Sequence, residues 1–182
     1  CVVQPELTEG PFYVDTDLVR SDIREGKEGA LLARTFNVSQ IVDNVCSPLE
    51  NALVDVWHAD AGGDYSGVGH LASQQFLRGV QMTDASGNAA FTTIYPGWYR
   101  GRTPHIHFKV RSSDASSPAY EFTSQLFFDN GLSARVYEQA PYRARGMQDV
   151  TNERDGIYAR GGARMLLAVS EAEPGYAATF EV

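Results

Sequence analysis

Hydrophobic and polar residues alternate with a period of two in many short runs of this chain. The run Ala52–His58 reads Ala-Leu-Val-Asp-Val-Trp-His, which predicts a strand with two differently exposed faces. The same pattern predicts strands over 31–38, 40–45, 78–83, 89–94, 105–110, 123–128, 165–169 and 178–182. Turn signals separate these runs, and one short helix is predicted near 132–139. We therefore expect an all-β fold, an antiparallel β-sandwich with long loops and at most one or two short helices.

No repeat, low-complexity tract or linker divides the 182 residues, so a single domain over 1–182 is expected. Residues 1–28 contain Pro, Gly and scattered acidic residues without alternation, which predicts an N-terminal loop segment. Residues 29–182 then form the β-sandwich core. A chain of this length can bury such a core without metal or disulfide support.

The charge balance excludes two classes of partner. The chain has 15 Lys and Arg against 23 Asp and Glu, a net charge of -8, and no basic run. Nucleic acid is therefore not an expected partner. No apolar run is long enough to cross a bilayer, so no membrane span is expected.

The two cysteines, Cys1 and Cys46, are too few for a metal site and do not form a CxxC pair. We favour a disulfide between them, which implies an oxidising compartment and a secreted, extracellular protein. Two free thiols, or a lipid-modified Cys1, are the alternatives. The sequon Asn37-Val38-Ser39 fits secretion, although such triplets often arise by chance.

The stretch from Tyr95 to His107 carries the chemistry. His105 and His107 stand two apart in a predicted strand, so both imidazoles leave the same face and could bind one metal ion. No histidine follows His107, so the later histidine of a cupin-type site is missing. Phenol pKa values lie near ~10, so only a strongly acidic ion makes tyrosinate a favourable ligand at neutral pH. With tyrosines nearby, ferric iron fits best and zinc fits poorly.

A second cluster, Val54–Ser66, is a predicted strand that runs into a glycine-rich turn presenting Tyr65. By itself, Tyr65 is equally well a tyrosine at the edge of the core, and His58 a packed core histidine. Arg78, after Phe76-Leu77, could equally be a buried ion-pair partner.

Six segments together are similar to the intradiol ring-cleavage dioxygenases, the family of catechol 1,2-, hydroxyquinol 1,2- and protocatechuate 3,4-dioxygenases. These segments, in order, are 5–13, 56–60, 63–66, 76–79, 95–99 and 102–107. The resemblance extends to at least Gln125 and is closest in layout to the secreted, stand-alone members. It implies a β-sandwich that binds non-haem Fe(III) through two tyrosines and two histidines.

Carried over by motif position, the resemblance implies a role for each residue of the site. The metal ligands would be Tyr65, Tyr99, His105 and His107. Tyr99 would be the ligand that leaves when substrate binds and accepts one of its protons. Arg102 would stabilise developing negative charge beside the substrate, and Gln125 would face the same pocket. Tyr13 at the pocket mouth, together with Leu18, Asp60 and Trp98, would contact substrate.

The implied reaction uses O2 to cleave catechol-type aromatics between the two hydroxylated carbons, giving cis,cis-muconate-type diacids. Lignin- or plant-derived catechols outside the cell are the expected substrates. The long helical segment through which catechol and hydroxyquinol enzymes dimerise is missing, so that assembly is not expected. The rival interpretations are a non-catalytic β-sandwich module that binds carbohydrate or a protein, and a metal-dependent enzyme of another type, such as a hydrolase or cupin-like oxygenase.

Overall fold

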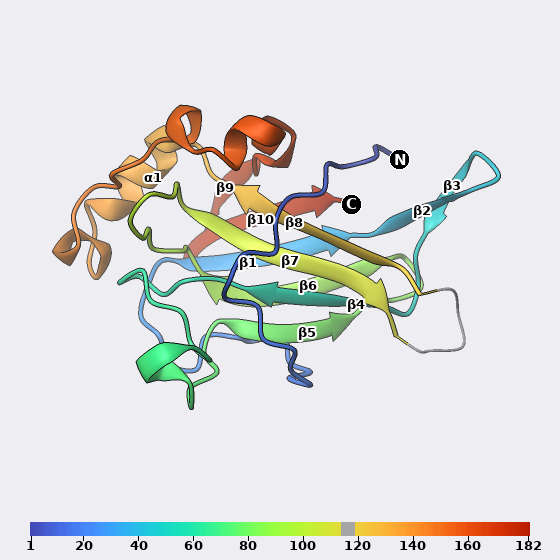
Figure 1. Cartoon of the computed structure of the whole chain (residues 1–182), viewed down its shortest axis with the longest axis horizontal. Helices are drawn as coiled ribbons and strands as arrows, with labels where there is room; N and C mark the ends of the chain where they lie inside the picture. Colours follow the sequence, from blue (N-terminus) through green and yellow to red (C-terminus); the bar gives the residue numbers. More distant parts are fainter. Residues whose placement is uncertain (114–118) are drawn as a thin grey trace.

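Two four-stranded sheets form the body of the molecule in the computed structural model, which describes residues 1–113 and 119–182 (Figure 1). The first sheet has the strand order β6-β1-β10-β9, with bounds Asn88–Ile94, Leu31–Asn37, Gly175–Glu181 and Val169–Ala172. The second has the order β5-β4-β7-β8, with bounds Arg78–Met82, Ala52–Trp57, His105–Ser112 and Glu121–Phe127. A separate hairpin, β2 (Ser39–Val42) and β3 (Val45–Pro48), projects from one end of the sandwich (Figure 1). The predicted all-β sandwich is confirmed.

The alternation in the sequence sorts side chains onto the two faces of each strand. In β7, Ile106 and Phe108 lie in the hydrophobic core, so the intervening His107 must point away from it. The same holds in β4, where Val56 joins the core and Trp57 belongs to a separate aromatic cluster. The second sheet therefore has an apolar inner face and an outer face that carries imidazole and aromatic side chains.

The register of the second sheet places one row of side chains across that outer face. Trp57 is paired with His107, which is paired with Gln125 on β8, and Trp57 is also paired with Arg78 on β5. Directly opposed residues in antiparallel strands project to the same side. Four residues far apart in the sequence thus lie side by side.

One part of the predicted sheet is wrong in direction. β1 pairs with β10 in parallel, with Leu32 opposite Tyr176, while its other neighbour β6 is antiparallel. A parallel pair needs a long connection, and here nearly the whole chain separates the two strands. Alternation within a strand carries no information about the direction of its neighbour, so the pattern alone did not reveal this pair.

The N-terminal segment runs over the outer face of the second sheet (Figure 1). Leu7 donates its N–H to the carbonyl of Thr123 on edge strand β8, and Val19 forms a parallel bridge with Val80 on the opposite edge strand β5. We call residues 5–20 the N-terminal strap. It has no strand or helix of its own, as the loop prediction for this segment requires.

The predicted helix is present as α1 (Asn130–Tyr137), two residues earlier than expected, because the Asp129 carboxylate caps it by accepting the N–H of Leu132. The strand predicted over 165–169 is wrong. The 3-10 helix η5 (Gly162–Met165) occupies its start, an isolated bridge joins Leu166 to Phe127, and the observed strand β9 begins only at the last predicted residue, Val169. Four further 3-10 helices are η1 (Gly69–Leu71), η2 (Tyr142–Ala144), η3 (Asn152–Arg154) and η4 (Tyr158–Arg160).

The predicted disulfide is confirmed: Cys1 and Cys46 are bonded, with their Cα atoms 5.6 Å apart. It ties the start of the chain to strand β3. Among the described residues, no helix has the length and apolar character to span a bilayer.

Candidate metal centre

Two imidazoles form the base of a buried polar cluster at one end of the second sheet. His105 and His107 project from the outer face of β7, and each is at most 2% exposed. Their Nε2 atoms lie 3.1 Å apart. The prediction that the two rings point at one place is borne out by this geometry.

The tautomer of His105 follows from its partner. Its Nδ1 lies 2.7 Å from the carbonyl oxygen of Thr103, which can only accept a hydrogen bond. Nδ1 therefore carries the proton, and the lone pair of Nε2 faces the cluster. Burial, and then the charge of Arg102, lowers the pKa of His105 to about 3, and burial also holds the pKa of His107 well below its usual value. Both rings are neutral at physiological pH, which is the form that binds metals.

Two loops bring tyrosines to this end of the sheet. Tyr65 lies on the loop between β4 and β5, and Tyr99 on the loop between β6 and β7. The two loops are packed against each other at Gly63, whose φ is +87°, and an added Cβ there would lie 2.2 Å from the carbonyl oxygen of Trp98. Only glycine allows both that backbone conformation and that approach. The glycine-rich turn before Tyr65 is thus a packing requirement.

The phenol groups complete the cluster. The Tyr99 hydroxyl lies 3.2 Å from His105 Nε2, and the ring centroids of Tyr65 and His107 are 6.2 Å apart. Burial raises the pKa of Tyr65 well above its usual value and also raises that of Tyr99. Both phenols therefore stay protonated unless a strong positive charge lies next to them.

Two atoms of the cluster are left without a partner. The Tyr65 hydroxyl and His107 Nδ1 are buried and form no hydrogen bond within the described residues. Unpaired buried polar atoms are uncommon and call for a ligand, ion or water. The described part of the chain contains no group of three or more His, Cys, Asp or Glu side chains suited to a metal. A metal held here by more than the two imidazoles would take its further protein ligands from the tyrosines, and such a donor set fits a strongly acidic ion.

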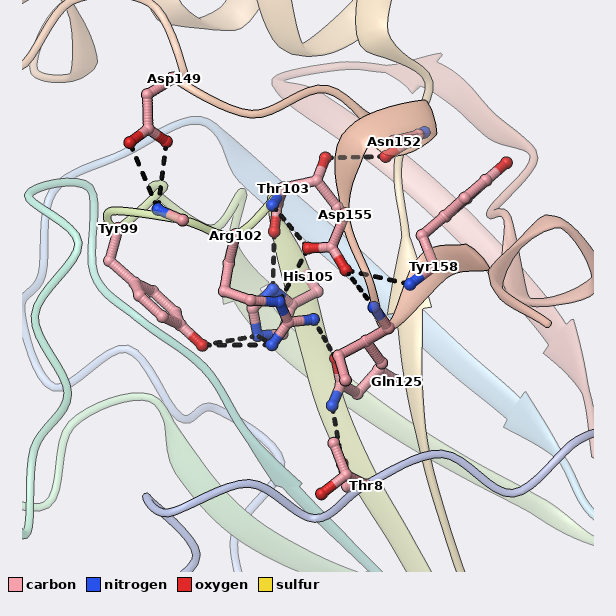
Figure 2. A network of polar contacts seen from close by, with 12 residues as sticks. Thr8, Tyr99, Arg102, Thr103, His105, Gln125, Asp149, Asn152, Asp155 and Tyr158 are labelled. Carbon is pink, nitrogen blue, oxygen red and sulfur yellow. Dashed lines mark hydrogen bonds and ion pairs between the residues drawn. The ribbon is translucent and has the colours of Figure 1, made fainter. Parts of the chain in front are cut away.

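Arg102 reaches the cluster from the side (Figure 2). Its Nη1 lies 3.4 Å from both the Tyr99 hydroxyl and His105 Nε2. Its Nη2 donates to Gln125 Oε1 at 2.6 Å, and its Nε donates to Asp155 at 2.7 Å. A fixed positive charge therefore lies beside the two imidazoles and the half-buried phenol.

The N-terminal strap covers the cluster from outside. Gln125 Nε2 donates to the carbonyl of Thr8, and a Cβ added to Gly10 would lie 3.2 Å from Cε1 of His107. Phe12 stacks on Tyr65 with ring centroids 4.5 Å apart. The strap is thus a wall of the site rather than a loose terminus.

A cavity of about 210 Å³ opens beside the tyrosines. Its lining residues come from the strap and the two tyrosine-bearing loops: Phe12, Gly63, Asp64, Tyr65, Val68, Gly69, His70, Leu71 and Tyr99. A larger cavity of about 620 Å³ lies elsewhere, between the N-terminus and the β2–β3 hairpin. The smaller cavity contacts the cluster through Tyr65 and Tyr99.

Four residues predicted to contact substrate do not line that cavity: Tyr13, Leu18, Asp60 and Trp98. Tyr13 packs on Trp57 beneath the Lys109 ammonium, and burial raises its pKa to about 12. The carbonyl of Leu18 accepts the N–H of Val80.

The other two shape the loops. The Asp60 carboxylate pairs with Lys27 and accepts the N–H groups of Gly62 and Asp64, which closes the turn before Tyr65. Trp98 Nε1 donates to the carbonyl of Gly146. For all four, substrate contact stays a prediction.

Three residues of the site were missed from the sequence. Phe12 and Trp57 form aromatic stacks on Tyr65 and His107, the latter with centroids 5.0 Å apart. Asp155 holds Arg102 from a segment without strand periodicity. Trp57 lies in a strand whose alternation was visible in the sequence, so the outward direction of its side chain could have been predicted. No local sequence pattern pointed to Asp155.

Comparison with known proteins is consistent with this geometry. A family model described as Dioxygenase matches residues 8–136. Chlorocatechol 1,2-dioxygenase of Pseudomonas sp. (strain P51) is 31% identical over 103 residues, which cover 47% of this chain and 39% of that protein. The protocatechuate 3,4-dioxygenase beta chain of Burkholderia cepacia is 34% identical over 116 residues, covering 56% of this chain and 46% of its own. The chain thus spans less than half the length of these curated relatives.

Solved structures match over the whole chain. The intradiol ring-cleavage dioxygenase from Tetranychus urticae has a TM-score of 0.87 at 30% identity, covering 100% of this chain and 94% of its own. The dioxygenase domain of a dioxygenase carbohydrate-binding protein fusion from Streptomyces sp. SirexAA-E has a TM-score of 0.72 at 30% identity, covering 98% and 95%. Because the family model matches well over half of the residues and these folds align from end to end, the chain belongs to the intradiol ring-cleavage dioxygenase family.

Proposed function

We propose that this protein is a non-haem ferric-iron intradiol dioxygenase. It takes catechol-type aromatics and O2 and cleaves the bond between the two hydroxylated carbons, giving cis,cis-muconate-type diacids. Tyr65, Tyr99, His105 and His107 hold the iron. The observation that carries this proposal is the meeting of two neutral imidazoles and the Tyr99 hydroxyl, with the Tyr65 ring packed against that of Tyr99, its hydroxyl buried and unpartnered among the described residues, and Arg102 Nη1 within reach.

The donor set supports ferric iron in particular. Two phenolates neutralise much of the charge of the ion and make it hard to reduce, and the two imidazoles offer Nε2 lone pairs without first losing a proton. The Tyr65 hydroxyl, which has no partner among the described residues, gains one when a cation is bound. When bound, ferric iron would supply a Lewis acid that a catecholate can chelate through both oxygens and that activates the ring.

The protein residues around the ion have separate roles in this proposal. Tyr99 is half-buried and within reach of Arg102, so its oxygen is the proposed acceptor of one catechol proton, while the more deeply buried Tyr65 stays in place. Arg102 offers Nη1 to negative charge that develops on the substrate, and a preorganised donor of this kind usually contributes strongly in a site sheltered from water. Gln125 holds the guanidinium and ties it to the strap.

The cavity supports a small aromatic substrate. At about 210 Å³, with Phe12, Val68 and Leu71 in its lining, it suits a single ring with limited substituents. The Cys1–Cys46 disulfide supports an oxidising compartment, so we propose an extracellular enzyme acting on lignin- or plant-derived catechols.

The proposal is tested with purified protein and a panel of substituted catechols. Iron content, the visible phenolate-to-iron absorption band and the product of the reaction with O2 are measured together. A ferric protein that forms muconate supports the proposal. A colourless protein without iron, or a ring-opened semialdehyde as product, contradicts it.

A matched pair of variants tests the ligand assignment. Tyr65→Phe removes one hydroxyl from the cluster, so we expect loss of most iron and of activity. Tyr176→Phe removes a hydroxyl from β10 in the other sheet and serves as the control. His107→Ala should resemble Tyr65→Phe. If either cluster variant retains both iron and activity, the assignment is wrong.

A further inference from the structure

Asp155 is a buried carboxylate that does not reach the cluster itself. Its side chain is fully buried and accepts four N–H donors (Figure 2). Oδ2 accepts from Arg102 Nε at 2.7 Å and from the backbone N–H of Thr103 at 2.9 Å. Oδ1 accepts from the N–H groups of Ile157 and Tyr158 at 2.7 and 3.0 Å.

We propose that Asp155 is a positioning residue for the reaction, which aims Nη1 of Arg102 at the substrate side of the metal centre. This inference rests on the proposed function and adds a residue to it. Nothing in the strand pattern or in the motifs around the histidines points to Asp155. It acts through Arg102 and does not touch substrate.

The geometry of Arg102 carries the inference. A guanidinium is planar and rigid, so fixing two of its nitrogens fixes the direction of the third. Asp155 holds Nε and Gln125 holds Nη2, which leaves Nη1 to point at the Tyr99 hydroxyl and at His105 Nε2. Without the Asp155 contact, the guanidinium keeps one short hydrogen bond, to Gln125, and two long contacts of 3.4 Å, so the side chain is freer to rotate away.

A second connection runs through the backbone. The peptide that follows Arg102 donates its Thr103 N–H to Asp155, and the carbonyl of Thr103 accepts the Nδ1 proton of His105. The same carboxylate therefore anchors the segment that orients the imidazole. Partners of this kind, one step removed from a metal ligand, typically change metal affinity or activity by 10–100-fold when they are lost.

Only a carboxylate suits this position. All four partners of Asp155 are N–H donors, and a carboxylate offers acceptors on both oxygens. An asparagine would turn an NH2 group toward two of those donors and leave them unpaired. Substitution by asparagine is nearly equal in size, so it tests the chemistry without creating a cavity.

Asp155 could also act only as a brace for its own loop, because Oδ1 caps the N–H groups of Ile157 and Tyr158. A double-mutant cycle separates the two roles. If Asp155 works mainly through Arg102, Asp155→Asn should have a much smaller effect once Arg102→Met has removed the guanidinium, and the remainder passes through the Thr103 contact. A loop brace would lower activity equally in both backgrounds.

The experiment uses the iron-loaded full chain. We measure kcat and KM for catechol, iron content, the visible absorption band, and the affinity for 4-nitrocatechol by absorbance. Asp155→Asn should lower kcat/KM by 10–100-fold with iron content unchanged. The control is Asp149→Asn, since Asp149 is an exposed acceptor from Gly101 N–H in the same loop system and does not bond to Arg102. It should stay within about twofold of the wild type.

The two proposals fail in different ways. If the wild type holds no iron and leaves catechol intact, the proposed function fails. The crystal structure of Asp155→Asn then decides the inference by itself, and Arg102 in an unchanged position overturns it. If the wild type is active, an Asp155→Asn variant with wild-type kcat/KM, or with an equal loss in the Arg102→Met background, overturns the inference.

Discussion

Gly10 is where the N-terminal strap contacts the candidate metal centre, so its replacement by alanine is a direct test of the strap as a wall of that site. Its φ is +74°, in the left-handed region, and the new Cβ would lie 3.2 Å from Cε1 of His107. Adding the methyl group has two separable consequences, backbone strain and a close contact with the ring of His107, a proposed ligand.

The strain has a measurable size. An L-residue in the left-handed region costs about 1–2 kcal/mol. In a chain of this length, each kcal/mol lowers Tm by about 2–4 °C. Gly26 provides a matched control, because its φ is +76° and an added Cβ would have no atom within 4 Å. Gly26→Ala and Gly10→Ala should therefore lose similar amounts of stability from strain.

Only Gly10→Ala should also affect the site. The contact at 3.2 Å must relax by a few tenths of an ångström, and the strap is held by Thr8, which accepts from Gln125, and by an ion pair between Glu9 and Lys109. Since a displacement of 1 Å in a catalytic group can cost about 100-fold, a shift of this size should lower kcat/KM by about threefold to tenfold.

Thermal unfolding, iron content and catechol turnover are measured for both variants and the wild type. The expected outcome is a similar loss of Tm in the two variants, with reduced kcat/KM and a shifted visible band for Gly10→Ala alone. Equal turnover in Gly10→Ala and Gly26→Ala would show that the strap moves aside to accommodate the methyl group without displacing His107. It would refute the view that the strap holds His107 in place.

Three further predictions concern stability. Arg34 is buried, and its Nε and Nη2 have no partner among the described residues. Arg34→Met should therefore raise the free energy of unfolding, measured in urea, by about 1–2 kcal/mol. A lower free energy of unfolding in the variant would mean that the protein compensates the buried charge. Reducing the Cys1–Cys46 disulfide, which closes a separation of 45 residues, should cost about 4 kcal/mol, with no effect of reductant on a double Ser variant. Burial lowers the pKa of His58 to about 4 in the folded state. As the pH falls from ~6.5 to 4, only the unfolded state takes up this proton, so each pH unit should lower the free energy of unfolding by about 1.4 kcal/mol. When the free energy from urea unfolding is plotted against pH, His58→Gln should have the shallower slope.

The sequence predicted most of the fold because alternation is a local property. The strand run that contains His105 and His107 gave the phase of β7, and with it the shared direction of both imidazoles. The predicted disulfide and short helix are also present. The parallel pairing of β1 with β10 and the 3-10 turn at Met165 were not predicted, since strand direction and tight turns depend on contacts distant in sequence.

For the candidate site, the sequence alone indicated the types of donor and placed the two histidines on one face of a strand. Tyr65 entered through motif resemblance, because its distance from His107 along the chain hides any spatial relation. The tertiary structure decided that the two tyrosine loops meet at Gly63, that the strap covers His107, and that Asp155 holds Arg102. The physical reason is that periodicity sets the direction of a side chain relative to its own strand, whereas loop packing and strand register set which side chains meet.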